Sequence, residues 1–182
     1  MNGSDLTPGQ SVQARARAVR MIVFDVDGVL TDGSLFYDDR GEEYKAFNSR
    51  DGHGIKMLRA SGVETGIITG RTSQVVLHRC RNLGIVHIHQ GADDKLEAFG
   101  RLLAATGLEA RQIAYMGDDL VDLPVMNRCG LAITVPDAPA EVRARCQVVT
   151  QAGAGRGAAR EACELIMRAQ GTWAAQIAHY DR

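Results

Sequence analysis

The sequence predicts an α/β protein with a doubly wound parallel sheet, folded as a single domain over residues 1–182. Short apolar runs alternate with segments whose apolar residues recur at helical spacing, as in strands joined by crossover helices. Three of the apolar runs, at 21–24, 63–69 and 112–116, lead directly into glycine or aspartate, which are residues that end strands. The sequence contains no internal repeat and no linker that would divide it into domains.

The composition excludes several classes of protein. The net charge is −1 and no long basic run occurs, so a nucleic-acid partner is not expected. No apolar stretch is long enough to span a membrane. The N-terminal segment lacks the apolar centre of a signal peptide, and residues 1–10 are predicted to be a flexible tail. The cysteines form no CxxC pair, which indicates free thiols in a reducing cytoplasm; they are Cys80, Cys129, Cys146 and Cys163.

The first predicted strand, 21–24, is apolar throughout, so we expect it to be buried on both faces of the sheet. Two short strand-like runs follow around a turn at 38–41, and they predict a β-hairpin over 34–47, inserted after the first strand. A lone hairpin buries little of its own surface. Its large side chains are expected to find cover on another subunit or, as the alternative, on their own domain; they are Leu35, Phe36, Tyr37, Tyr44 and Phe47.

Capping residues and glycines set the boundaries of the remaining elements. Asp51 is predicted to cap a short helix over 55–60. Thr72 or Ser73 is predicted to cap the next helix, which Gly84 closes. In chain order the elements after that first helix are strand 63–69, helix 73–83, strand 85–88, helix 93–103, strand 112–116, helix 120–128, strand 131–135, helix 140–146, strand 147–150, a flexible glycine-rich segment at 151–157 and helix 161–169.

Two aspartates at the end of the first strand indicate a site for phosphoryl transfer. Asp25 follows a central parallel strand at its carboxyl end, where ligands bind in open α/β sheets. A carboxylate at this place can attack a phosphoryl group and form an aspartyl phosphate. Asp27 can protonate the leaving oxygen and later take a proton from water. We assign Asp25 as nucleophile and Asp27 as general acid/base; the plainer alternative is a solvated turn, since Asp and Gly are common turn residues.

Further polar residues follow the ends of other predicted strands. Asp118, Asp119 and Asp122 come after one of them. Thr69 ends another, and Lys95 opens a helix. So many carboxylates need a cation, and hard oxygen ligands without a nearby His or Cys favour Mg²⁺. Thr69 can donate its hydroxyl to a phosphoryl oxygen, and Lys95 can offset the charge that develops during transfer.

These residues lie in the motifs DVDGVLTDG, ITGR, a lone lysine and GDDLVD, and about residues 20–170 resemble the haloacid dehalogenase-like phosphatases. The resemblance implies a Rossmann-like haloacid dehalogenase fold and magnesium-dependent catalysis by Asp25 and Asp27. It implies that Asp25, the main-chain carbonyl of Asp27 and Asp118 bind the metal. The other implied site residues are Thr69, Gly70 and Lys95 around the phosphate, with Asp119 and Asp122 supporting the metal or its waters.

The spacing of the motifs leaves no room for a cap domain. The chain between Asp27 and Thr69 suffices for a hairpin and one helix, and that between Thr69 and Lys95 for a helix and a strand. A site without a cap is open to water and to wrong substrates. A neighbouring subunit could close it, which agrees with the apolar hairpin.

Other segments, among them 47–55 and 157–161, resemble the 3-deoxy-D-manno-octulosonate 8-phosphate phosphatases. That resemblance implies a cytoplasmic homotetramer that acts on a small sugar-acid phosphate in lipopolysaccharide biosynthesis. Arg71 and Arg79 would bind the sugar acid, because arginine binds carboxylates through paired hydrogen bonds. For Arg79 a solvated helix face is the alternative. Phosphatases of nine-carbon keto-sugar acids share this architecture, so the length of the sugar stays open.

Two other classes of protein share parts of the pattern. Signalling receiver domains also combine a phosphorylated aspartate, a threonine and a lysine on a doubly wound sheet. Their acidic pair precedes the phosphorylated strand end, whereas residues 14–24 contain no acidic residue here. A non-catalytic oligomerisation domain, of the kind attached to sugar cytidylyltransferases, is the second alternative, and the intact motifs argue against it.

Overall fold

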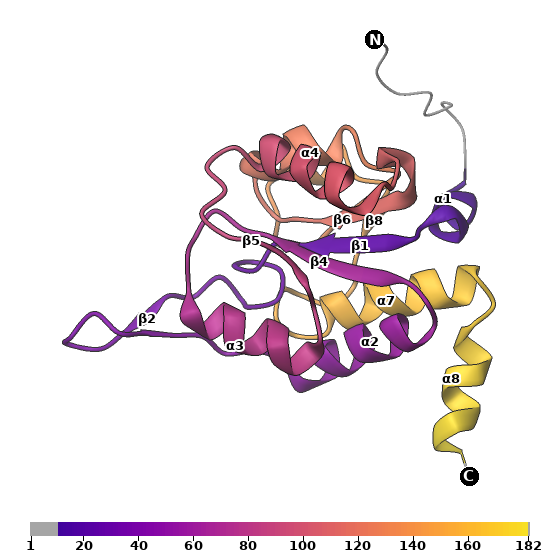
Figure 1. The fold of residues 1–182 in the computed structure, drawn as a ribbon, viewed down its shortest axis with the longest axis horizontal. Helices are drawn as coiled ribbons and strands as arrows, with labels where there is room; N and C mark the ends of the chain where they lie inside the picture. Colours follow the sequence, from indigo (N-terminus) through magenta and orange to yellow (C-terminus); the bar gives the residue numbers. More distant parts are fainter. Residues whose placement is uncertain (1–10, 182) are drawn as a thin grey trace.

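The computed structural model describes residues 11–181, so the tail predicted for residues 1–10 lies outside the described part. One parallel sheet has the strand order β5-β4-β1-β6-β7-β8 (Figure 1). All four residues of β1 are fully buried, which confirms the prediction for the first strand. The strands of this sheet are β1 Met21–Phe24, β4 Glu64–Ile68, β5 His87–His89, β6 Ile113–Met116, β7 Leu131–Thr134 and β8 Val148–Val149.

Helices cover both faces of the sheet, as a doubly wound fold requires. Figure 1 shows α4 on one face and α2, α3 and α7 on the other. Within residues 11–181, no helix is both long and apolar enough to cross a membrane. The helices are α1 Val12–Ala18, α2 Ser49–Ala60, α3 Gln74–Leu83, α4 Lys95–Thr106, η1 Ala110–Gln112, η2 Leu120–Asp122, α5 Leu123–Met126, α6 Ala140–Arg143, α7 Ala158–Ala169 and α8 Trp173–Tyr180.

Some boundaries differ from the prediction for local reasons. The helix expected over 120–128 is split into η2 and α5, because Asp119 caps Leu120 and Pro124 starts a new turn. The helix expected over 140–146 is a single turn, α6. Helix α1 was not expected, since only Ala16 on it is buried. The predicted thiols Cys80, Cys129, Cys146 and Cys163 are free.

The predicted hairpin is confirmed and consists of β2 Phe36–Tyr37 and β3 Glu43–Tyr44, paired antiparallel. Figure 1 shows β2 projecting from the body of the molecule. Phe47 packs against the hydrophobic core of its own domain. The other large apolar side chains are each about half exposed, from 49% to 58%; they are Leu35, Phe36, Tyr37 and Tyr44.

Asp51 does not cap its own helix, so that prediction was wrong. Asn48 caps α2 by accepting a hydrogen bond from the Arg50 amide at 2.8 Å. Asp51 lies inside α2, is only 2% exposed, and accepts hydrogen bonds from the amides of Gly157 (3.2 Å) and Arg160 (2.8 Å). Its carboxylate therefore caps the N-terminus of α7, more than 100 residues away, where a negative charge is favourable.

The glycine-rich segment at 151–157 is bound to the loop that follows β1. The Gly155 amide donates to the Val29 carbonyl at 2.9 Å. Gly155 has φ +61°, and a Cβ there would overlap the backbone of Thr31 and Asp32. The close approach of the two backbones explains this glycine. Together with Asp51, these contacts place the segment beside the carboxyl end of the central strand.

Replacing Asp51 by alanine is expected to lower the free energy of unfolding by about 2 kcal/mol, because two amides of α7 lose their acceptor. Urea denaturation followed by circular dichroism measures this change. Asp39→Ala, in the exposed hairpin turn, is the control and is expected to change stability by less than about 0.5 kcal/mol. Equal stability of Asp51→Ala and the wild type would contradict the capping role.

Candidate active site

Asp25 stands where the central strand leaves the sheet. Its amide still donates to the Met116 carbonyl of β6 at 2.9 Å, so its backbone position is fixed by the strand ladder. One carboxylate oxygen accepts from the Val26 amide at 2.7 Å. The other lies 2.8 Å from the Nζ of Lys95, whose side chain is 4% exposed. The structure therefore places the predicted nucleophile beside the predicted phosphate-binding lysine.

Gly28 lets the loop after β1 approach Asp118. The loop turns tightly, since the Val26 carbonyl accepts from the amides of Leu30 (2.9 Å) and Thr31 (3.0 Å). Gly28 has φ +81°, and a Cβ at this position would collide with the Asp118 carboxylate. Glycine avoids both the backbone strain and the collision. The DVDGVLTDG and GDDLVD motifs thus meet at the carboxyl edge of the sheet.

Asp122 is fully buried and connects four groups of the site. Its Oδ1 accepts from Lys95 Nζ at 2.6 Å and from the Tyr115 hydroxyl at 2.7 Å. Its Oδ2 accepts from the amides of Asp118 (3.0 Å) and Asp119 (3.2 Å). Gly117 leaves room for this carboxylate, since a Cβ there would collide with it. Asp122 therefore fixes Lys95 and the turn that carries Asp118.

Burial and crowding perturb the protonation of the buried groups. Burial and the charges of Asp25 and Asp122 raise the pKa of Asp118 to about 7. Burial also raises the pKa of Asp25, against the lowering effect of Lys95. For Lys95, burial acts to lower the pKa, but Asp25 and Asp122 outweigh it and raise the pKa. Lys95 therefore stays protonated, but its charge does not neutralise the surrounding carboxylates of Asp25, Asp118 and Asp122.

The carboxylates fit a divalent cation. Asp25, Asp118 and Asp122 each offer an oxygen, and these oxygens lie within 4.8 Å of one another. The oxygens of Asp122 already accept four hydrogen bonds, so Asp25 and Asp118 are the better ligands. A hard cation on these oxygens would offset the charge that raises the pKa of Asp118. The donor set suits Mg²⁺, and Asp122 would support the site through Lys95 and the turn.

Asp27 lies among cations, one of which comes from the hairpin. Lys45 Nζ is 2.5 Å from Asp27 Oδ1 and 3.2 Å from Glu43 Oε1. Arg71 Nε is 3.6 Å from Asp27 Oδ2, and Arg71 also donates to Glu43 and to the Tyr37 hydroxyl. The structure thus brings Arg71 to the site, as the resemblance implied. Lys45 and Glu43 were missed, because Glu43 lies in a two-residue strand and Lys45 directly follows it, and nothing in so short a sequence pattern shows which side chains face inward.

The remaining predicted residues are divided between the site and its surroundings. Thr69 is 2% exposed at the end of β4, and its amide donates to the His89 carbonyl at 2.9 Å. Gly70 follows it at the surface. Arg79 lies elsewhere, since its guanidinium donates to the Asn48 carbonyl at 3.1 Å and lies over the Phe47 ring. Within residues 11–181, Arg79 forms no hydrogen bond or ion pair with Asp25 or Asp27, so its role as a substrate contact stays a prediction.

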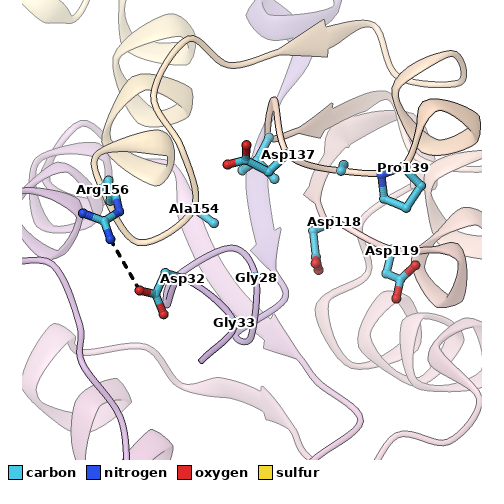
Figure 2. A pocket seen from close by; sticks show the side chains of 11 residues that line it. Gly28, Asp32, Gly33, Asp118, Asp119, Asp137, Pro139, Ala154 and Arg156 are labelled. Carbon is cyan, nitrogen blue, oxygen red and sulfur yellow. Dashed lines mark ion pairs between the residues drawn. The ribbon is translucent and has the colours of Figure 1, made fainter. Parts of the chain in front are cut away.

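A cavity of about 310 Å³ adjoins the carboxylates. Figure 2 shows Asp118 and Asp119 on one side of it and Asp32 and Arg156 on the other. Arg156, from the glycine-rich segment, lies 3.6 Å from Asp32 as an ion pair. Asp119 accepts a hydrogen bond from the Leu120 amide and is exposed at the cavity wall. Asp137 also lines the cavity and was not expected from the sequence.

A buried aspartate after the central strand, an adjacent lysine and a paired-aspartate turn, on a parallel sheet without a cap, define a hydrolase of the haloacid dehalogenase class. A family model described as haloacid dehalogenase-like hydrolase matches residues 81–161. This match sets aside the receiver-domain alternative, and 47% identity to a phosphatase over 88% of the chain shows a phosphoric monoester hydrolase rather than an oligomerisation domain.

The chain belongs to the 3-deoxy-D-manno-octulosonate 8-phosphate phosphatase family. It is 47% identical over 160 residues to the Escherichia coli phosphatase KdsC of that name, covering 88% of this chain and 85% of that protein. The crystal structure of the Yersinia pestis phosphatase superposes with a TM-score of 0.88 at 45% identity, covering 90% of this chain and 88% of that one. The structure of the Moraxella catarrhalis phosphatase, solved with magnesium, phosphate and KDO, has a TM-score of 0.91 at 43% identity. The match covers 93% of this chain and 97% of that one.

Asp122→Asn is expected to reduce kcat at least about tenfold and to lower the free energy of unfolding by about 3 kcal/mol, because Lys95 loses a buried counter-charge. Phosphate release and urea denaturation report the two effects. Glu97→Gln, on the exposed face of α4, is the matched control and should behave as the wild type. A variant with full activity and stability would show that Asp122 does not hold the site together.

Proposed function

We propose that this chain hydrolyses 3-deoxy-D-manno-octulosonate 8-phosphate to the free sugar acid and phosphate, through an aspartyl phosphate on Asp25. The observation that carries the proposal is the Asp25 carboxylate, held at the end of β1 between Lys95 and Asp118. The names of the relatives support the choice of substrate. The product would then enter lipopolysaccharide biosynthesis.

In the first step, an oxygen of Asp25 attacks phosphorus and the bond to the sugar oxygen breaks. Mg²⁺, when bound by Asp25, the main-chain carbonyl of Asp27 and Asp118, reduces the repulsion between the carboxylate and the phosphate. Lys95 and the Thr69–Gly70 turn bind the phosphoryl oxygens, and the lysine charge stabilises the transition state. Asp119 and Asp122 support the cation and its waters.

Asp27 moves the protons of both steps. As the sugar oxygen leaves, Asp27 gives it a proton, so that an alcohol rather than an alkoxide departs. In the second step Asp27 takes a proton from water, which attacks the aspartyl phosphate and releases Asp25. The Asp27 side chain is 20% exposed, so water and the leaving group can both reach it.

Arginines provide charge for the sugar acid. Arg71 lies beside Asp27 and contacts Glu43, and its side chain is still 43% exposed, so an anionic group of the substrate can reach it. Arg79 is the second candidate for the carboxylate of the sugar. A nine-carbon keto-sugar acid phosphate remains the alternative substrate, because the same two charges would serve it.

The active enzyme is proposed to be a cytoplasmic homotetramer. The exposed apolar side chains of the hairpin, Phe36, Tyr37 and Tyr44, are a surface that another copy of the chain can cover. A neighbouring copy would also limit the access of water to a site that has no cap.

The purified chain with Mg²⁺ is expected to release phosphate from 3-deoxy-D-manno-octulosonate 8-phosphate with a higher kcat/KM than from a nine-carbon analogue. Excess chelator is expected to abolish turnover. Asp25→Asn should leave less than about one-thousandth of kcat, because an amide is not a nucleophile. Activity that survives in chelator or in Asp25→Asn would contradict this chemistry, and preference for the nine-carbon ester would change the substrate.

Phe36→Lys combined with Tyr44→Glu is expected to shift the assembly toward monomer and to raise KM. The two residues are cross-strand partners, so opposite charges preserve the hairpin while removing its apolar surface. Sedimentation and steady-state kinetics measure the two effects. Val86→Lys changes an exposed apolar residue outside the hairpin and is the control. A wild-type chain that is monomeric at micromolar concentration and fully selective would contradict the assembly.

A further inference from the structure

A lysine of the hairpin is buried against the proposed acid/base. The Lys45 side chain is only 1% exposed, and its Nζ lies 2.5 Å from Asp27 Oδ1. A buried ammonium is costly unless it is paired, and Glu43 Oε1 at 3.2 Å provides a second counter-charge. Lys45 therefore occupies a defined place in the site, although it is not one of the motif residues.

Lys45 makes the closest of the side-chain contacts to Asp27. The Thr31 hydroxyl lies 3.4 Å from the same carboxylate oxygen, and Arg71 Nε lies 3.6 Å from the other. Arg71 is 43% exposed, so its side chain has more freedom than that of Lys45. A short charge-assisted hydrogen bond from a buried donor is the contact best able to fix the direction of the Asp27 carboxyl group.

We propose that Lys45 is the positioning residue of Asp27, which rests on the proposed function in which Asp27 is the acid/base. Proton transfer requires the donor and acceptor atoms to lie at hydrogen-bond distance in the transition state. The Lys45 ammonium holds the Asp27 carboxyl group so that the proton of Asp27 passes to the sugar oxygen. This transfer accompanies breaking of the bond between that oxygen and phosphorus and formation of the bond from Asp25 to phosphorus. The same orientation serves the second step, when the proton of the attacking water passes to Asp27.

The test compares two phosphate esters that differ in their need for an acid. The sugar-acid phosphate releases an alcohol and needs a proton, whereas p-nitrophenyl phosphate releases a stable phenolate and does not. The ratio kcat/KM reports only the steps up to departure of the leaving group, so it isolates the first proton transfer. Both esters are assayed with the full chain and saturating Mg²⁺.

Lys45→Met keeps the length of the side chain and removes its charge. It is expected to lower kcat/KM for the sugar-acid phosphate at least about tenfold and to change that for p-nitrophenyl phosphate by less than about threefold. The kcat for both esters is expected to fall, because hydrolysis of the aspartyl phosphate also uses Asp27. Lys56→Met, at an exposed position of α2, is the matched control and is expected to match the wild type on both esters.

Lys45→Gln is made in parallel, because it keeps a donor at the buried position and gives the same comparison if Lys45→Met does not fold. Its loss is expected to be smaller but to depend on the leaving group in the same way. Lys45→Arg keeps the charge and is expected to recover part of the activity on the sugar-acid phosphate. Equal losses of kcat/KM on the two esters, or no loss on either, would overturn the proposal.

Asp27→Asn separates this proposal from the proposed function. In that background Lys45→Met is expected to add less than about a twofold further loss, because the two residues act as one unit. If Asp27→Asn turns over the sugar-acid phosphate at the wild-type rate, the acid/base assignment itself fails. If Asp27→Asn is impaired but Lys45→Met is not, only the role of Lys45 is overturned.

Discussion

The ammonium of Lys95, held between the buried carboxylates of Asp25 and Asp122, is the interaction on which the site depends. Away from water, these charges are tolerated only because they are paired and hydrogen-bonded. Asp122 is saturated by Tyr115 and by two amides of the GDDLVD turn, so it cannot move without disturbing the end of β6. Asp25, the proposed nucleophile, is therefore aligned by a network that runs from the core to the edge of the sheet.

Close backbone approach makes this network possible. Gly28 admits the Asp118 carboxylate, and Gly117 admits that of Asp122, so the two loops meet at the end of neighbouring parallel strands. Burial raises the pKa of Asp118, and the negative charges of Asp25 and Asp122 brought close by this approach raise it further. Cation binding and acceptance of an anionic substrate are then linked, since the cation offsets the charge that would otherwise repel the phosphate.

The hairpin has two different faces in function. Its polar residues point into the site of their own chain, where Glu43 contacts Arg71 and Lys45 contacts Asp27. Phe36 and Tyr44, which are cross-strand partners, remain about half exposed, while Tyr37 pairs with Glu43 and accepts a hydrogen bond from Arg71. Asp51 and Gly155 hold the glycine-rich segment beside the loop after β1. Within residues 11–181, both the hairpin and the glycine-rich segment thus contact the loop after β1.

The sequence by itself determined the class of fold and indicated which residues to propose as the catalytic set. Apolar runs and their glycine or aspartate ends located β1, β4 and β6, and parallel strands necessarily bring Asp25, Thr69 and Asp118 to one edge. Such information is local, because the period of the pattern and the residue that ends it lie next to each other in the chain.

Only the tertiary structure decided which distant groups meet. Asp51 caps a helix more than 100 residues away instead of its own, since Asn48 already caps α2. Tyr115 reaches Asp122 through the packing of β6. Lys45 reaches Asp27 through the fold of a hairpin whose strands are two residues long. Long-range packing decides the direction of side chains in so short a strand and the partner of each buried charge. Neither can be predicted from the pattern of neighbouring residues.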